Sequence, residues 1–250
     1  MGGSDETPKK PQVSFKTRVL NEVISNAEVY YSHFVCVDYL VFSPAFHNHS
    51  YYEISAHKGN YLHLTGVSTA LSADEFFDKC LNGTLTEDDF TLGGSSRNEK
   101  TAKGAIRDKI RSLPFMPSVI GPGSLVEEDF KKNRVSCSFA SSDGLITMGF
   151  IALSQALPMT LLRGNELDHH KAQPVRVVLS KKSDEVLYSS ILCGAISDLI
   201  PYFGEIKHLL NDDLKNRVAA FLPKDEAERN KNADPANANV AQSIQNPGES

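Results

Sequence analysis

The sequence lacks any run of apolar residues long enough to cross a membrane. A bilayer span needs roughly 18 such residues, and no uninterrupted run approaches that length. Residues 1–12 are polar and contain proline, which is not the pattern of a secretory signal peptide. We therefore expect a cytoplasmic protein with a flexible leader over 1–12 and no membrane partner.

Cysteine is also scarce, and no two cysteines form a C-x-x-C pair. The four are widely separated, and each lies among apolar neighbours: Cys36, Cys80, Cys137 and Cys193. This pattern favours buried free thiols over zinc ligands or disulfides.

Neither sign of charge dominates, since 26 basic and 31 acidic residues give a net charge of −5. The composition therefore offers no global case for nucleic-acid binding, which would require a local basic face. The length of 250 residues allows one large domain or two small ones.

The common fingerprints of nucleotide-binding proteins and hydrolases are absent, namely G-x-G-x-x-G, G-x-x-x-x-G-K-[ST] and G-x-S-x-G. Asp168, His169 and His170 are adjacent, and His47 and His49 fall in an expected loop, so neither group has the spacing of a metal site. Metal-free acid–base chemistry remains, with no cofactor. It needs a proton acceptor, a proton donor and a cation.

Hydrophobic periodicity and turn residues predict one α+β domain over 13–222, followed by a disordered tail over 223–250. Helices are expected over 15–32, 72–82 (after the capping box at 72–75), 99–113 and 197–222. Strands are expected over 33–43, 51–57, 61–67, 135–139, 145–152, 174–180 and 186–193, with the turn 142–144 closing a hairpin.

The stretch NYLHLTGVSTA at 60–70 is the first candidate for chemistry. We expect His63 at a strand end, close to the Thr65 hydroxyl and to a sharp turn at Gly66. The alternative is that His63 merely packs beside Tyr61.

A second candidate is PVRVVLSKKSDEVLYSS at 174–190, interpreted as strand, turn and strand. Arg176 and Ser180 would share one face, and Tyr188 would lie on the return strand near Lys181 and Lys182. Guanidinium, ammonium and phenol groups suit an anionic phosphodiester. The alternative is the solvated face of a half-exposed hairpin. The helix over 99–113 is basic on one side and includes Arg111, which either faces solvent or contacts phosphate.

Five stretches occur in an order that resembles a known family: YLHLTGV at 61–67, FFDKCLNGTLTEDDF at 76–90, RSLPFMPSVIG at 111–121, PMTLL at 158–162 and PVRVVLSKKSDEVLYSSILCGA at 174–195. The sequence is similar to the fourth phage-associated set of predicted nucleases, which is grouped with barnase, EndoU, the tRNase colicins and RelE. The resemblance covers roughly 15–195 and leaves out 197–222 and the tail.

The resemblance implies N-terminal helices packed on an antiparallel β-sheet, with a C-terminal helical extension outside it. It implies metal-independent RNA cleavage, in which the 2′-OH attacks the neighbouring phosphate. The family's catalytic positions fall on His63, Thr160, Arg176, Lys181 and Tyr188. Thr65, Arg111, Ser180 and Lys182 are the expected substrate-binding residues.

These expectations describe a phage- or prophage-linked endoribonuclease toxin in the bacterial host cytoplasm, acting on tRNA or mRNA and possessing an antitoxin or host-protein partner. The main alternative is a non-catalytic module on the same fold that binds and inhibits a host protein. The acidic composition favours that module, because proteins that grip RNA usually show a basic surface. A nucleotide-modifying enzyme that uses His63 and Tyr188 is a third reading.

Overall fold

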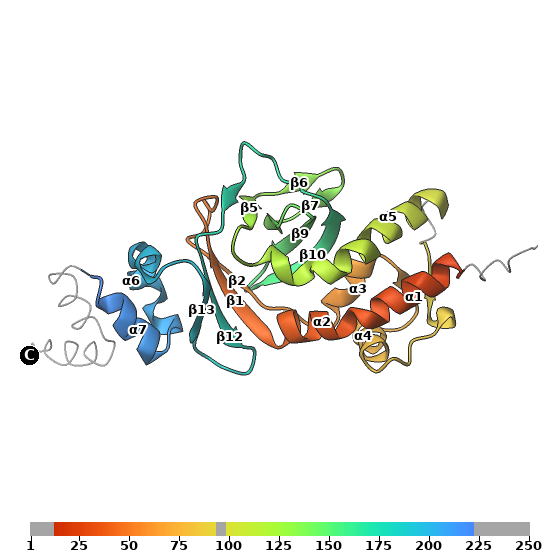
Figure 1. The fold of residues 1–250 in the computed structure, drawn as a ribbon, viewed down its shortest axis with the longest axis horizontal. Coiled ribbons are helices and arrows are strands. Elements are labelled where there is room, and N and C mark those ends of the chain that lie inside the picture. Colours follow the sequence, from red (N-terminus) through yellow and green to blue (C-terminus); the bar gives the residue numbers. More distant parts are fainter. Residues whose placement is uncertain (1–12, 94–98, 223–250) are drawn as a thin grey trace, which may run out of the picture.

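The computed structural model describes residues 13–93 and 99–222 (Figure 1). The predicted leader and tail lie outside these residues. The chain folds as a mixed α+β protein with a strongly curled nine-stranded sheet, which agrees with the predicted fold class. Across the described residues, no helix combines the length and apolar character needed to cross a membrane.

The helices are α1 Phe15–Ser25, α2 Ala27–Tyr30, α3 Asn60–Thr65, α4 Ala73–Leu81, α5 Glu99–Ser112, α6 Phe203–Ile206 and α7 Asp212–Ala219, with shorter η1 Tyr31–Val35, η2 Glu87–Asp89, η3 Leu113–Val119, η4 Ile196–Tyr202 and η5 Lys207–Leu209. The strands are β1 Val37–Phe42, β2 Tyr52–Ile54, β3 Ser68–Thr69, β4 Phe90–Thr91, β5 Leu125–Glu128, β6 Lys131–Lys132, β7 Val135–Ser136, β8 Phe139–Ser142, β9 Ile146–Ala152, β10 Ala156–Arg163, β11 Gln173–Pro174, β12 Val177–Lys182 and β13 Ser190–Cys193.

The sheet runs in the order β11-β5-β8-β9-β10-β2-β1-β12-β13. Its neighbouring strands are antiparallel except for β10 and β2, which are joined by one parallel pair, Ala156 with Ile54. A single residue pair therefore joins the two halves of the sheet at this point.

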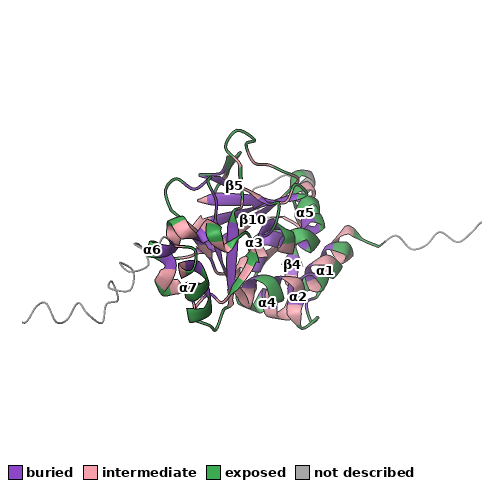
Figure 2. Cartoon of the chain, turned by 60° about the vertical axis from the view of Figure 1, so that its left-hand side comes forward, coloured by how far each residue is buried: buried purple, intermediate pink, exposed green. Residues whose placement is uncertain are grey.

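Strands β1 and β12 are buried on both faces. In Figure 2 the strands at the centre of the molecule are mostly purple, the colour of buried residues. Along β1, Tyr39 and Val41 belong to the main core, whereas Leu40 and Phe42 belong to a second core with residues of β12, η4, α6 and α7. This alternation follows from the two-residue repeat of a strand. The alternative expectation for 174–190 is that one face of the hairpin is exposed to solvent. This expectation is wrong for β12, whose residues 177–180 are buried on both faces.

The strand predicted over 61–67 is wrong, because 60–65 form helix α3. Tyr61 and Leu64 are buried three positions apart, while His63 between them is exposed. Gly66 ends the helix with φ of 74°, a left-handed conformation that glycine adopts without strain. A short apolar run of this kind fits both a helix and a strand, and the three-residue repeat prevails here.

Several local predictions are confirmed. The Ser72 hydroxyl accepts a hydrogen bond from the Glu75 backbone. The Glu75 carboxylate in turn accepts hydrogen bonds from the Ser72 hydroxyl and then from the Ser72 backbone, and both lower the pKa of Glu75. Asp143 accepts bonds from the backbone of Leu145 and Ile146 and so shapes the β8–β9 hairpin.

The cysteines are free thiols, as predicted, although only Cys80 and Cys137 are fully buried. Burial raises the pKa of Cys80 to about 12 and that of Cys137 to about 11. Both thiols are therefore protonated at neutral pH and are poor nucleophiles.

The segment predicted as one helix over 197–222 is instead divided into η4, α6, η5 and α7. Pro201 lies within η4, where it removes a backbone donor. Leu210 is extended and forms a bridge with Tyr188, after which the Asn211 side chain caps α7. These elements cover the second core.

Candidate active site

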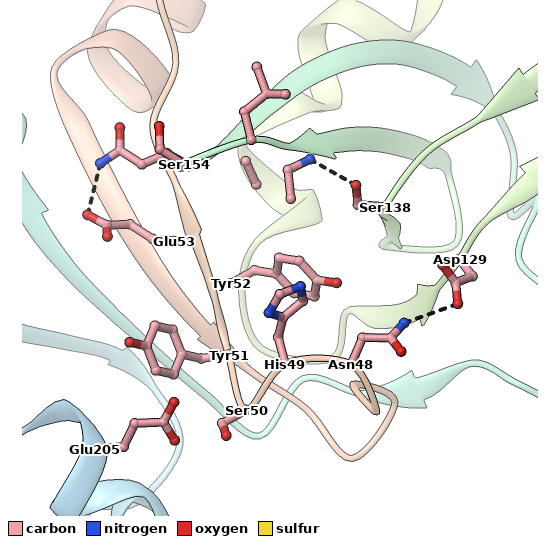
Figure 3. Close-up of a pocket in the computed structure, with 14 residues that line it drawn as sticks. Asn48, His49, Ser50, Tyr51, Tyr52, Glu53, Asp129, Ser138, Ser154 and Glu205 are labelled. Atoms are coloured by element: carbon pink, nitrogen blue, oxygen red, sulfur yellow. Dashed lines mark hydrogen bonds between the residues drawn. The ribbon is translucent and has the colours of Figure 1, made fainter.

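A cleft of about 670 Å³ opens where β2 and β10 part. Its walls come from the loop before β2, the turn between β9 and β10, and helix α6 (Figure 3). The groups of chemical interest that line it are His49, Tyr51, Glu53, Asp129, Gln155 and Glu205.

The loop that carries His49 is fixed by the buried carboxylate of Glu128. One oxygen of Glu128 accepts bonds from the backbone of His47 (2.5 Å) and Asn48 (3.0 Å), and the other accepts the Tyr52 hydroxyl (2.7 Å). The His49 ring lies edge-on to the Tyr52 ring at 4.9 Å and is exposed to solvent (Figure 3). The loop therefore holds an accessible imidazole at the cleft.

Glu53 joins the cleft to a buried charged cluster. Its Oε1 accepts a bond of 3.1 Å from Gln155 and lies 4.0 Å from Lys181 Nζ. Lys181 Nζ also lies 3.3 Å from Asp38 Oδ2 and donates to the Glu185 carbonyl. Strand register explains this grouping, because Asp38 is paired with Lys181 across β1 and β12, and Glu53 is paired with Leu40 across β1 and β2.

Tyr188 lies against this cluster with its ring 5.3 Å from Lys181 Nζ. Its side chain is fully buried, and neither its hydroxyl nor Asp38 Oδ1 has a hydrogen-bond partner among the described residues. Burial, and then the nearby Glu53 carboxylate, raise the pKa of the Tyr188 phenol, so it stays neutral at physiological pH. Buried polar atoms without partners are rare and are typical of functional sites.

The cleft itself is acidic. Glu53, Asp129 and Glu205 line it, and none of the described residues lining it is a lysine or arginine. Burial, and then the Glu205 and Glu53 carboxylates, raise the pKa of Tyr51. Within 13–93 and 99–222, no group of three or more His, Cys, Asp or Glu side chains is placed to hold a metal ion.

The structure brings together two of the predicted catalytic residues, Lys181 and Tyr188. Arg176 is exposed ahead of β12, and its guanidinium lies 3.9 Å from Asp198. Ser180 is buried and pairs with Tyr39, a main-core residue, so it faces away from Lys181.

Lys182 is exposed at the end of β12. Of the two substrate-binding residues predicted on this strand, Ser180 is therefore buried and Lys182 is exposed to solvent.

The remaining predicted residues lie elsewhere. Thr65 is buried at the end of α3, where its hydroxyl bonds to the Leu62 carbonyl, and Thr160 is buried on β10. Arg111 is exposed on α5.

Helix α3 packs into the main core, whereas Tyr188 belongs to the second core across β1 and β12. The expected convergence of His63, Arg176 and Tyr188 in one patch is therefore absent. The exposed His63 does not pack in the core beside Tyr61 either.

Sequence reasoning missed His49 and Glu53 as site residues. One signal was present, because Asp38 and Glu53 are charges inside otherwise apolar strands, and such charges are seldom buried without a partner. The contact of Glu53 with Lys181 depends on the pairing of strands that are more than a hundred residues apart.

A family model described as phage-Barnase-EndoU-ColicinE5/D-RelE like nuclease4 matches residues 24–192. No curated protein and no solved structure matched the chain. The matched region runs from the end of α1 into β13 and includes the cleft loop, Glu53 and Lys181. The chain therefore belongs to the phage-associated barnase/EndoU/colicin/RelE-like nuclease family.

Proposed function

We propose that the protein is a metal-independent endoribonuclease and that the β2–β10 cleft is its active site. The observation that carries the proposal is that an accessible imidazole, His49, and a carboxylate, Glu53, line the same cleft, with Lys181 Nζ 4.0 Å from Glu53. Membership of a nuclease family makes a phosphodiester the expected substrate.

In this mechanism Glu53 accepts the proton of an RNA 2′-hydroxyl. The 2′-oxygen then forms a bond to the adjacent phosphorus while the bond from phosphorus to the 5′-oxygen breaks. Protonated His49 donates its proton to the leaving 5′-oxygen. The products are a 2′,3′-cyclic phosphate and a 5′-hydroxyl, and each proton transfer of this kind typically contributes 10²–10⁴-fold in rate.

Lys181 acts through Glu53 in this scheme, because its side chain is only 10% exposed and does not line the cleft. Its ammonium and the Gln155 amide fix the orientation of the carboxylate. Together with protonated His49, Lys181 offsets the negative charge that a phosphodiester brings into the acidic cleft. The ring of neutral Tyr188 packs against the Lys181 ammonium, with its centre 5.3 Å from Nζ.

The test is incubation of the purified chain with tRNA and total RNA in the presence of EDTA. The proposal predicts cleavage products that end in 2′,3′-cyclic phosphate, and losses on the order of 10²–10³ in rate for His49→Gln and Glu53→Gln. His63→Ala is the matched control for imidazole loss and should retain activity. Loss of activity in His63→Ala alone would place the chemistry at α3 instead.

We further propose that the protein acts as a phage- or prophage-linked factor in a host cell, in keeping with the description of its family. The acidic lining of the cleft favours a second function, a non-catalytic module that receives a basic surface of a host protein. Absence of RNA cleavage, together with saturable binding of a purified host protein that Glu53→Lys and Glu205→Lys abolish, would support the module.

A further inference from the structure

A separate groove of about 200 Å³ lies between helices α1 and α5, which lie beside each other in Figure 1. Three arginines from the two helices line it, Arg18 from α1 and Arg107 and Arg111 from α5. Glu22 is the carboxylate among the described lining residues, so positive charge is in excess.

An aromatic ring organises the groove. The guanidinium carbons of Arg18 and Arg107 lie 5.6 and 5.3 Å from the centre of the Phe15 ring, one from each helix. Arg111 follows Arg107 by one helical turn and extends the row along α5. The ring thus draws together two like charges that would otherwise repel each other.

These three guanidiniums keep their hydrogen-bonding capacity for a partner. All three residues are exposed, and none of them has an ion pair to another described residue, in contrast to Arg163, Arg176 and Arg217. Each guanidinium presents a planar fork of donors that matches the oxygens of a phosphate.

We propose that this groove binds the phosphate backbone of single-stranded RNA. The charge of the partner follows from the three arginines. The choice of RNA rests on the proposed function, whose acidic cleft has no lysine or arginine among its described lining residues to hold a polyanion. Guanidinium planes also stack with unpaired bases, which an acidic polypeptide lacks.

The test is fluorescence anisotropy with 5′-labelled, fully 2′-O-methylated single-stranded RNA, which has no free 2′-hydroxyl and is therefore not cut. The variant is Arg18→Gln/Arg107→Gln/Arg111→Gln. The matched control removes three charges from the opposite end of the chain: Lys207→Gln/Lys215→Gln/Arg217→Gln. Glutamine keeps much of the side-chain stem, and circular dichroism should show that both variants are folded.

The groove variant should bind on the order of 10²-fold more weakly at 0.1 M salt, and its slope of log affinity against log salt should be shallower by about 2. The control should behave like the unaltered chain. Equal affinity and slope in all three proteins would overturn the proposal. If labelled polyglutamate of matched charge binds as tightly as the RNA, this result would also overturn the proposal and would favour an acidic protein partner.

Because binding is measured on RNA that is not cut, failure of the proposed cleavage leaves this result standing. On cleavable RNA, the groove variant should raise KM while kcat stays within about twofold, since the groove and the cleft share no lining residue. An unchanged KM would contradict RNA binding in the groove, even where RNA cleavage by the wild type is confirmed.

Discussion

Replacement of Tyr188 by phenylalanine should stabilise the protein. The Tyr188 hydroxyl is fully buried, and it has no hydrogen-bond partner in the described part of the chain. A buried polar group without a partner costs about 1–3 kcal/mol, whereas the void left by one oxygen atom costs only about 0.5 kcal/mol. The ring, and with it the contact to Lys181, is retained.

We therefore expect the free energy of unfolding of Tyr188→Phe to rise by about 1 kcal/mol at pH 7, or Tm by about 2–4 °C. Urea titration followed by circular dichroism measures this change. Tyr61→Phe is the matched control, because Tyr61 is equally buried but its hydroxyl donates to the Val23 carbonyl at 2.8 Å. The control should lose about 1 kcal/mol.

A loss of more than about 1 kcal/mol in Tyr188→Phe would refute this reasoning, because it would mean that the hydroxyl is satisfied in the native protein. A gain in stability accompanied by slower RNA cleavage would instead assign the hydroxyl to function, since active sites commonly retain groups that reduce stability.

Three further predictions concern stability. Lys181→Met should lower the free energy of unfolding by about 3–5 kcal/mol in urea titrations, because it leaves the buried Asp38 and the partly buried Glu53 without their cation, and a loss below about 1 kcal/mol would contradict the cluster. Hydrogen bonds from Lys79 and Thr86 lower the pKa of Asp89 from 3.8 to about 2. Asp89 therefore contributes stability above pH 4 that is lost as pH falls towards 2, and the stability gap between wild type and Asp89→Asn should close across that window in acid titrations. Gly194→Ala should fold poorly, because Gly194 has φ of 90° and an added Cβ would lie 2.2 Å from the Arg176 carbonyl; thermal melts that match wild type would contradict this.

Local signals in the sequence predicted local structure well. The capping box at Ser72, the turn at Asp143 and the pairing of β12 with β13 all follow from neighbouring residues, and the structure contains each of them. The family resemblance likewise rests on ordered local motifs, and the family is confirmed.

The predictions that failed depend on contacts between distant segments. Residues 61–64 fit both a strand and a helix, and packing of Tyr61 and Leu64 in the main core selects the helix. The second core, which buries the other face of β12, is supplied by residues after Ala195 that lie outside the resemblance.

The cleft depends on the parallel pair between β2 and β10. These strands lie about a hundred residues apart in the sequence, and no local pattern announces such a pairing. The sequence alone therefore predicts His49 as a loop residue and not as a site residue.

Metal-independent RNA cleavage with Glu53 as the base is tested by single-turnover cleavage of 5′-labelled tRNA by the wild type and by Glu53→Gln, with EDTA present throughout. We expect 2′,3′-cyclic phosphate ends from the wild type and a rate on the order of 10²–10³ lower from Glu53→Gln. Equal rates from the two folded proteins, or wild-type cleavage only when a divalent metal is added, would contradict this mechanism.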